Sequence, residues 1–325
     1  MIRFPGARAA FAVALSCLGA IAANAQSAPY PNHTITLVLP FAAGSGTDTT
    51  TRLIAAQLST ALGQNVVIDN KPGANGMIAA TYVARSAPDG YTLFVTTNTT
   101  HSANPSLMKQ LTYDPVKDFT PIARTGNLPF MLVVNPDIPA KSVQELTALA
   151  KASPGKFSYA SGSSASIVMG ATYGRRAGLD LLHVPYKSSP PALTDVIGGR
   201  VSMMFIDIPT GLPHVNAGKL RGLAVTTRER SSLLPDVPSM EQSGVPDFDI
   251  TSWQGWFGPA NMPKEIVTKL NAAIRKIIET PDIRKQLGER GMDAFSGTPE
   301  DLGKFVDEQL VLWTRLIKDA GIEPE

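Results

Sequence analysis

The sequence TITLVLPFAAGSGTDTTTRLI at residues 34–54 places a strand, a loop and a helix in direct succession. Residues 34–39 are β-branched or apolar, which favours a buried strand. Small residues fill most of positions 41–47, and apolar residues then recur at helical spacing from Ile54 to Leu62. This order of elements is typical of a unit from a parallel α/β sheet.

Strands and helices continue to alternate along the chain. Further strands are predicted at residues 66–68, 91–95, 130–134, 157–160, 184–186 and 201–206. Helices are predicted at residues 77–85, 167–177 and 191–197, from Ser142, and in two long segments that follow Pro263 and Thr298. Alternation of this kind predicts parallel sheets built from βαβ units.

Composition excludes several classes of protein. The chain has 325 residues, of which 43% are hydrophobic and 17% are charged. These fractions exclude a disordered or collagen-like chain and allow a large core. Mean hydropathy is +0.02, which excludes a polytopic membrane protein. The net charge is +2, from 29 basic and 27 acidic residues without a block of like charges, so we expect no nucleic-acid partner.

Residues 1–25 have the features of a secretory signal. Arg3 and Arg8 supply a positive start, residues 9–23 are apolar, and Ala23-Asn24-Ala25 is a small-residue cleavage motif. The apolar run is shorter than a bilayer requires. Cleavage after Ala25 and a periplasmic location are therefore predicted in preference to an uncleaved anchor.

The only cysteine is Cys17, so a chain cleaved after Ala25 would contain none. Its absence excludes disulfides, a thiol nucleophile and a thiolate metal site from the mature protein. Lipidation at Cys17 is disfavoured, because Ala14 occupies the upstream position where a lipoprotein signal usually carries leucine.

Two loops, one in each half of the chain, share the same chemistry. Residues 41–48 and 161–166 consist mainly of Gly, Ala, Ser and Thr, and each loop precedes a predicted helix. Small residues let the backbone approach a ligand closely, and a helix start offers unpaired N–H groups with a partial positive charge. Both loops could instead be ordinary tight turns. Because there are two, we predict anion-binding loops that face each other across a cleft.

Catalytic and metal-binding patterns are weak. The chain contains no Gly-x-Ser-x-Gly elbow and no Gly-Lys-Ser/Thr phosphate motif. His33, His101, His183 and His214 are scattered, without a pair at metal-ligand spacing. We therefore predict no catalytic residue, no metal and no cofactor. Asp207 follows an apolar strand, where a helix cap and a ligand contact are equally good interpretations.

Taken together, these segments resemble the Bug-type solute-binding receptors of tripartite tricarboxylate transporters. The resemblance extends from about residue 34 to the end of the sequence given. It is carried by Pro40-Phe41-Ala42-Ala43-Gly44 with Thr47-Asp48 and Arg52, Asp69-Asn70-Lys71-Pro72-Gly73-Ala74-Asn75-Gly76, Pro88-Asp89-Gly90-Tyr91-Thr92-Leu93, Tyr113-Asp114-Pro115-Val116-Lys117-Asp118-Phe119, His183-Val184-Pro185-Tyr186-Lys187, Gly198-Gly199 and Leu234-Pro235-Asp236-Val237-Pro238.

The resemblance implies an α/β, two-domain periplasmic binding protein of type II-like architecture, with a ligand cleft between the domains. The expected first domain is discontinuous, residues 26–127 plus 228–325, and the second is residues 128–227. The implied function is that of an extracytoplasmic receptor that performs no chemistry. It would capture a small carboxylate, with an aliphatic or aromatic dicarboxylate favoured, and hand it to membrane transport subunits in transient contacts. A monomer is expected.

Carried over residue by residue, the family's ligand site falls on the two loops and on three further positions at strand ends. The implied ligand-binding residues are Phe41, Ala43, Gly44, Ser45, Gly46, Thr47, Asp48, Thr97, Asn98, Ser161, Gly162, Ser163, Ser164, Ala165 and Asp207. The chain departs from the family pattern in three places. Ser45 separates two glycines that are commonly adjacent, Ser163-Ser164 replaces Asn-Gly, and Ser188 replaces a glycine. The less polar second loop favours a more apolar ligand body.

Two other functions stay open at the level of sequence. A sensor that presents the bound carboxylate to a signalling partner would share the same fold and site. A secreted hydrolase would use a serine such as Ser163 with His183, and the missing nucleophile elbow argues against it.

Overall fold

The computed structural model describes residues 29–325. The chain divides into two units, Met1–Asn32 and His33–Glu325, and the fold described below is that of the second unit. The predicted signal segment, Cys17 and the cleavage after Ala25 lie outside the described residues and stay predictions.

The first sheet is mixed and has six strands. Their order is β11 (Asp293–Ala294), β4 (Phe119–Leu128), β10 (Ser252–Pro259), β3 (Thr92–Thr97), β1 (Ile35–Leu39) and β2 (Val66–Asn70). β1 pairs in parallel with β2 and β3, which confirms that part of the prediction. β10 runs antiparallel to β3 and β4. The predicted parallel pairing therefore holds for β1, β2 and β3 but does not extend across the sheet, because β10, a strand that the sequence pattern did not reveal, enters its middle in the antiparallel direction.

The second sheet is also mixed and has five strands. Their order is β7 (Leu181–Pro185), β6 (Phe157–Ser161), β8 (Met203–Asp207), β5 (Phe130–Val134) and β9 (Arg221–Val225). β6 runs parallel to β7 and β8, whereas β5 runs antiparallel to β8 and β9. The carboxyl ends of β6 and β8 therefore lie at the same edge of this sheet, where the second predicted loop and Asp207 follow.

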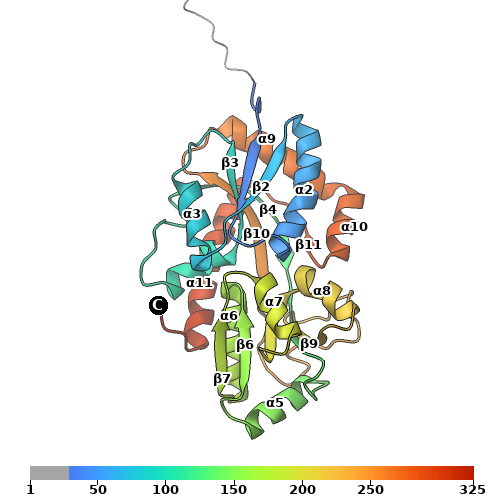
Figure 1. Cartoon of the computed structure of the whole chain (residues 1–325). Coiled ribbons are helices and arrows are strands. Elements are labelled where there is room, and N and C mark those ends of the chain that lie inside the picture. The colour runs from blue at the N-terminus through green and yellow to red at the C-terminus, as the bar shows by residue number, and fades with distance from the viewer. Residues whose placement is uncertain (1–28) are drawn as a thin grey trace, which may run out of the picture. The chain divides into compact units, whose positions relative to one another are not determined.

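The helices follow the strands closely in sequence (Figure 1). Those whose starts bear on the site are α2 (Gly46–Leu62) after β1, α6 (Ser164–Ala177) after β6, α7 (Ser189–Ile197) after β7 and α8 (Ile208–Asn216) after β8. The others are α3 (Met77–Ala84), α4 (Asn104–Leu107), α5 (Val143–Ala152), α9 (Lys264–Glu279), α10 (Pro281–Glu289) and α11 (Pro299–Asp319), with a short 3₁₀-helix η1 (Ala74–Gly76) and a short π-helix η2 (Thr99–Ala103). Within residues 29–325, no helix is both long and apolar enough to cross a membrane.

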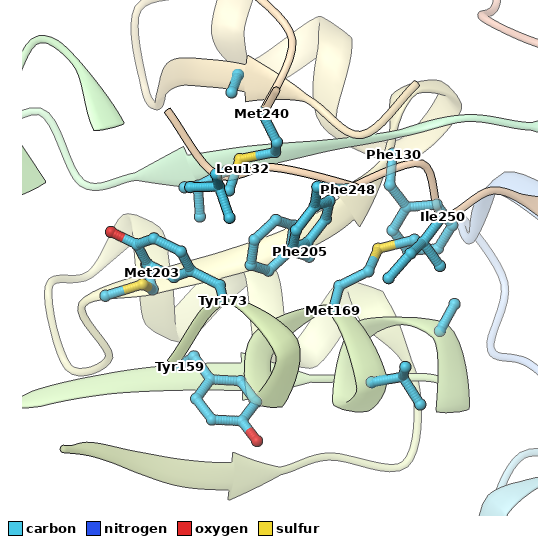
Figure 2. Packing of buried hydrophobic residues seen from close by; sticks show 14 of the residues in the cluster. Phe130, Leu132, Tyr159, Met169, Tyr173, Met203, Phe205, Met240, Phe248 and Ile250 are labelled. Atoms are coloured by element: carbon cyan, nitrogen blue, oxygen red, sulfur yellow. The ribbon is translucent and has the colours of Figure 1, made fainter. Parts of the chain in front are cut away.

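Each sheet has its own buried core. Around the second sheet, Phe205 and Phe248 stack with ring centroids 5.5 Å apart (Figure 2). Met240 also belongs to this core, although it follows β9 in the sequence, and Trp313 of α11 reaches it as well. The domain boundaries at residues 127 and 227 stay a prediction. The strands themselves change sheet between β4 and β5 and between β9 and β10.

Candidate ligand-binding cleft

The first predicted loop ends at Ser45, which caps α2. The Ser45 hydroxyl accepts a hydrogen bond of 3.3 Å from the amide of Asp48. The helix therefore begins directly after Ser45, although Thr47 and Asp48 are also residues that commonly cap helices. Within the described chain, the amides of Gly46 and Thr47 donate no hydrogen bond. These two N–H groups are free to bind an anion.

Asp48 supports this loop from behind. Its carboxylate forms an ion pair with Arg52 at 2.9 Å and accepts hydrogen bonds from the Gly44 amide at 2.9 Å and from Asn70 at 3.0 Å. Burial alone would raise the pKa of Asp48, but the hydrogen bonds from Arg52, Gly44 and Asn70 outweigh it and lower that pKa. The ionised carboxylate of Asp48 thus stabilises the conformation of the loop.

The second predicted loop ends at Ser163, which caps α6. The Ser163 hydroxyl accepts from the Ser166 amide, and the Ser166 hydroxyl accepts from the Ser163 amide at 3.1 Å, so the two form a capping box. The helix begins at Ser164, three residues before the predicted start at Ile167. The amides of Ser164 and Ala165 donate no hydrogen bond within residues 29–325. Both loops therefore end in a helix start with two free N–H groups.

The two loops meet at a small pocket of about 20 Å³. Its lining residues come from both sheets and their following helices: Phe41, Ser45, Gly46, Thr47, Thr97, Leu128, Phe130, Ser163, Ser189, Asp207 and Ser252. The amide of Ala42 donates a hydrogen bond of 3.0 Å to the hydroxyl of Ser188. This bond joins the first loop to the start of α7, so the two sheets are held closed around the pocket.

Asp207 supplies the only ionisable side chain among the described residues that line this pocket. Its Oδ1 atom accepts hydrogen bonds from the Thr210 amide at 2.9 Å and the Thr210 hydroxyl at 2.6 Å, which caps α8. Burial raises the pKa of Asp207. A Cβ atom on Gly46 would lie 2.0 Å from this Oδ1, so only glycine fits there. Both interpretations of Asp207 hold in the structure: it is a helix cap, and it lines the pocket.

The structure brings together part of the predicted site. Seven predicted residues line the pocket: Phe41, Ser45, Gly46, Thr47, Thr97, Ser163 and Asp207. Eight do not: Ala43, Gly44, Asp48, Asn98, Ser161, Gly162, Ser164 and Ala165. Sequence reasoning missed Leu128, Phe130, Ser189 and Ser252. Ser252 begins β10, and no sequence signal pointed to that strand.

The serine–histidine pair considered for a hydrolase, Ser163 with His183, does not form in the structure. His183 Nε2 lies 2.7 Å from the hydroxyl of Ser161, not Ser163, and its ring stacks on Tyr159 with centroids 4.8 Å apart. Burial lowers the pKa of His183. Among the described residues, no group of three or more His, Cys, Asp or Glu side chains is placed to hold a metal ion.

Comparison with known proteins matches residues 50–322 to the model of the tripartite tricarboxylate transporter family receptor. The solved structure of Rpa4515 from R. palustris with adipate is 36% identical, has a TM-score of 0.89, and is matched over 91% of this chain and 100% of that one. The periplasmic binding protein BugD is 33% identical, with a TM-score of 0.87 over 91% and 100%.

MatC from Rhodopseudomonas palustris with bound malate is 34% identical, with a TM-score of 0.83 over 89% of this chain and 100% of that one. These similarities confirm the predicted α/β fold of a periplasmic binding protein. The resemblance drawn from the sequence motifs is confirmed as well: this chain belongs to the tripartite tricarboxylate transporter receptor family.

Proposed function

We propose that this protein is an extracytoplasmic solute-binding receptor that captures a small carboxylate for a tripartite tricarboxylate-type transporter. The proposal depends mainly on one observation: the starts of α2 and α6 meet at one pocket. Hydroxyl groups line this pocket, and its described lining residues include no Lys or Arg. The relatives with adipate and malate support the same ligand class.

The physical basis is the charge at helix starts. The N-terminus of a helix carries a partial positive charge of about half a unit and exposes N–H donors. Each charge-assisted hydrogen bond to a carboxylate contributes roughly 1.5–3 kcal/mol net. Because the pocket is small, the starts of α2 and α6 converge on one anionic group. The proposed contacts are the predicted residues that line the pocket and the free amides of Ser164 and Ala165, with Ser189 and Ser252 added.

Several finer statements belong to the same proposal. The protein performs no chemistry, since Asp207 is engaged by Thr210 and the described pocket lining has no histidine to activate a hydroxyl. It resides in the periplasm after cleavage behind Ala25, acts as a monomer, and meets its membrane subunits transiently. No observation favours the sensor or the hydrolase.

Binding calorimetry on two glycine variants tests the proposed site. Gly46→Ala places a Cβ atom against Asp207 and should prevent closure, which weakens carboxylate binding by about tenfold or more, or at least 1.4 kcal/mol. Gly288→Ala is the matched control, because nothing lies within 4 Å of the added atom. Equal affinity in Gly46→Ala and wild type, with both folded, would place the ligand elsewhere.

A further inference from the structure

A second cavity of about 360 Å³ lies beside the small pocket. Its walls come from η1 and α3, the end of α4, the β6–α6 region, β7 and the last residues of the chain. They include Asn75, Met77, Tyr159, Ser161, Ser163 and His183. Apart from Ser161 and Ser163, none of these residues was predicted to bind ligand.

The two spaces share Ser163, the cap of α6. The small pocket, at about 20 Å³, has room for little more than one water molecule, which needs roughly 10–15 Å³ of such space. It can hold a carboxylate only if the rest of the molecule extends outward. The second cavity lies within the range of about 300–1,000 Å³ usual for small-molecule sites. An acid anchored at Ser163 therefore has one adjoining ligand-sized space for its body.

The chemistry of the second cavity is neutral and apolar where it is buried. Tyr159 stacks on His183, and the ring of Tyr159 rests against Gly170, where a Cβ atom would lie 2.2 Å from it. Tyr159 lies at the edge of the aromatic cluster in Figure 2. Met77 and Met108 supply adaptable apolar surface. The His183–Ser161 pair offers hydrogen bonds without a net charge, since burial disfavours the imidazolium.

Charge in this cavity is unfavourable to a second carboxylate. The ionisable lining residues other than His183 and the tyrosines are Glu323 and Glu325, both exposed at the rim, and the described lining contains no Lys or Arg. An anionic far end would meet these carboxylates without a cation to offset the repulsion. A neutral ring or apolar chain would not be repelled by these carboxylates.

The rim of the cavity is tied to the anion-binding loop. Asn75 adopts a left-handed backbone with φ of 51°, and its carbonyl accepts a hydrogen bond of 2.9 Å from Asn104. Asn104 in turn accepts one of 3.3 Å from the Ser164 hydroxyl, at the start of α6. This chain of contacts fixes the rim relative to the helix start that would hold the carboxylate.

We propose that this second cavity holds the body of the bound acid, and that the ligand is a monocarboxylate with a ring-sized, uncharged body. The proposal rests on the proposed function and narrows it. The carboxylate sits between the starts of α2 and α6, and the neutral body lies against Tyr159, His183 and Met77. A neutral hydroxyl or carbonyl on the body would meet the Ser161–His183 pair.

Matched acids test the ligand class. Calorimetry would compare benzoate, 4-hydroxybenzoate and cyclohexanecarboxylate with terephthalate, adipate and acetate. The proposal expects the ring monocarboxylates to bind about tenfold or more tightly than terephthalate, which adds only a second charge. Tighter binding of terephthalate or adipate would overturn it while leaving the proposed function intact. Failure of every acid, acetate included, would count against the proposed function itself.

Cavity-filling variants test the location. Met77→Trp should reduce the affinity for the ring acids by about tenfold or more, because the added bulk occupies the cavity, and should leave acetate binding unchanged. Ile78→Trp is the control, since Ile78 is the next residue of α3, is 53% exposed and does not line the cavity. Met108→Trp repeats the test from another element if Met77→Trp fails to fold. Ring-acid affinity equal to wild type in a folded Met77→Trp or Met108→Trp protein would overturn the proposal.

Discussion

Asp207 combines two roles that sequence alone left as alternatives. It caps α8 through Thr210, and among the described residues that line the small pocket it has the only ionisable side chain. The alternatives could not be separated beforehand because both use the same position, directly after a strand. The capping carboxylate lies inside the pocket because Gly46, at the start of α2, approaches it closely.

We predict that Asp207→Asn raises the melting temperature near pH 8. Burial raises the pKa of Asp207, so the stability from its protonated form is complete below the unfolded-state pKa and is lost as pH rises through the folded-state pKa. Asparagine can still accept from Thr210 and never ionises. Melting curves from pH 4 to pH 8 should show the variant's advantage growing with pH. An advantage that shrinks as pH rises would contradict the assigned direction of this pKa.

The cap of α2 shows where residue-level prediction stops. Ser45, Thr47 and Asp48 are all good N-cap residues, so composition cannot choose among them. The choice is made by side-chain contacts, because Asp48 is engaged by Arg52 one turn further along α2 and by Asn70 of β2. Ser45 is then left to cap the helix.

At the scale of elements, β10 decides how α2 is held. Gln254, in the middle of this strand, is fully buried. Its Oε1 accepts a hydrogen bond of 2.8 Å from Thr50, and its Nε2 donates one of 3.1 Å to Thr51. Both threonines belong to the first turns of α2. The helix start that we propose to bind the anion is thus tied to the sheet by this side chain.

We predict that Gln254→Met lowers the free energy of unfolding by about 1–3 kcal/mol, because it leaves Thr50 and Thr51 with fewer buried partners. It should also weaken carboxylate binding. Gln57→Met on the exposed face of α2 is the control and should change stability by about 0.5 kcal/mol or less. Urea unfolding measures both. If both variants lost the same free energy of unfolding, the hydrogen bonds of Gln254 would not be what holds α2 against the sheet.

Elements with a clear local pattern were predictable, and β10 was not. Residues 130–134 form an uninterrupted apolar run, and the structure has a strand at those residues. All eight residues of β10 are buried, so polar and apolar side chains do not alternate, and Gly255 and Gly258 interrupt it. A central strand that arrives from far along the sequence leaves no local signal of its partners.

At the scale of the whole molecule, the site depends on contacts between distant parts of the chain. Ala42 and Ser188, which hydrogen-bond across the two sheets, are separated by 146 positions. The order of family motifs predicted the fold, and the occurrence of two similar small-residue loops predicted that they face each other. The closeness of the loops, and the larger cavity beside them, could not be derived from spacing, because they depend on how the two sheets approach each other.

We predict that carboxylate affinity depends only weakly on salt. The net charge is +2, and the described pocket lining contains no Lys or Arg. Attraction by helix starts inside a closed pocket is screened much less than attraction by surface charges, so the dissociation constant should change by less than about threefold between 50 and 500 mM NaCl. Calorimetry across that range measures it. A steep, continuous loss of affinity would instead indicate binding by surface cations.

The most direct test of the receptor assignment compares acids with their amides in thermal unfolding. Protein stripped of bound ligand by unfolding and refolding would be heated with each carboxylic acid and with the carboxamide of the same shape. Ligand at a hundredfold excess over its dissociation constant stabilises the native state by about 2.7 kcal/mol. The account predicts a melting temperature raised by several degrees for at least one acid and unchanged by its amide. Equal stabilisation by acid and amide, or none by any acid across aliphatic, aromatic and amino-acid carboxylates, would contradict it.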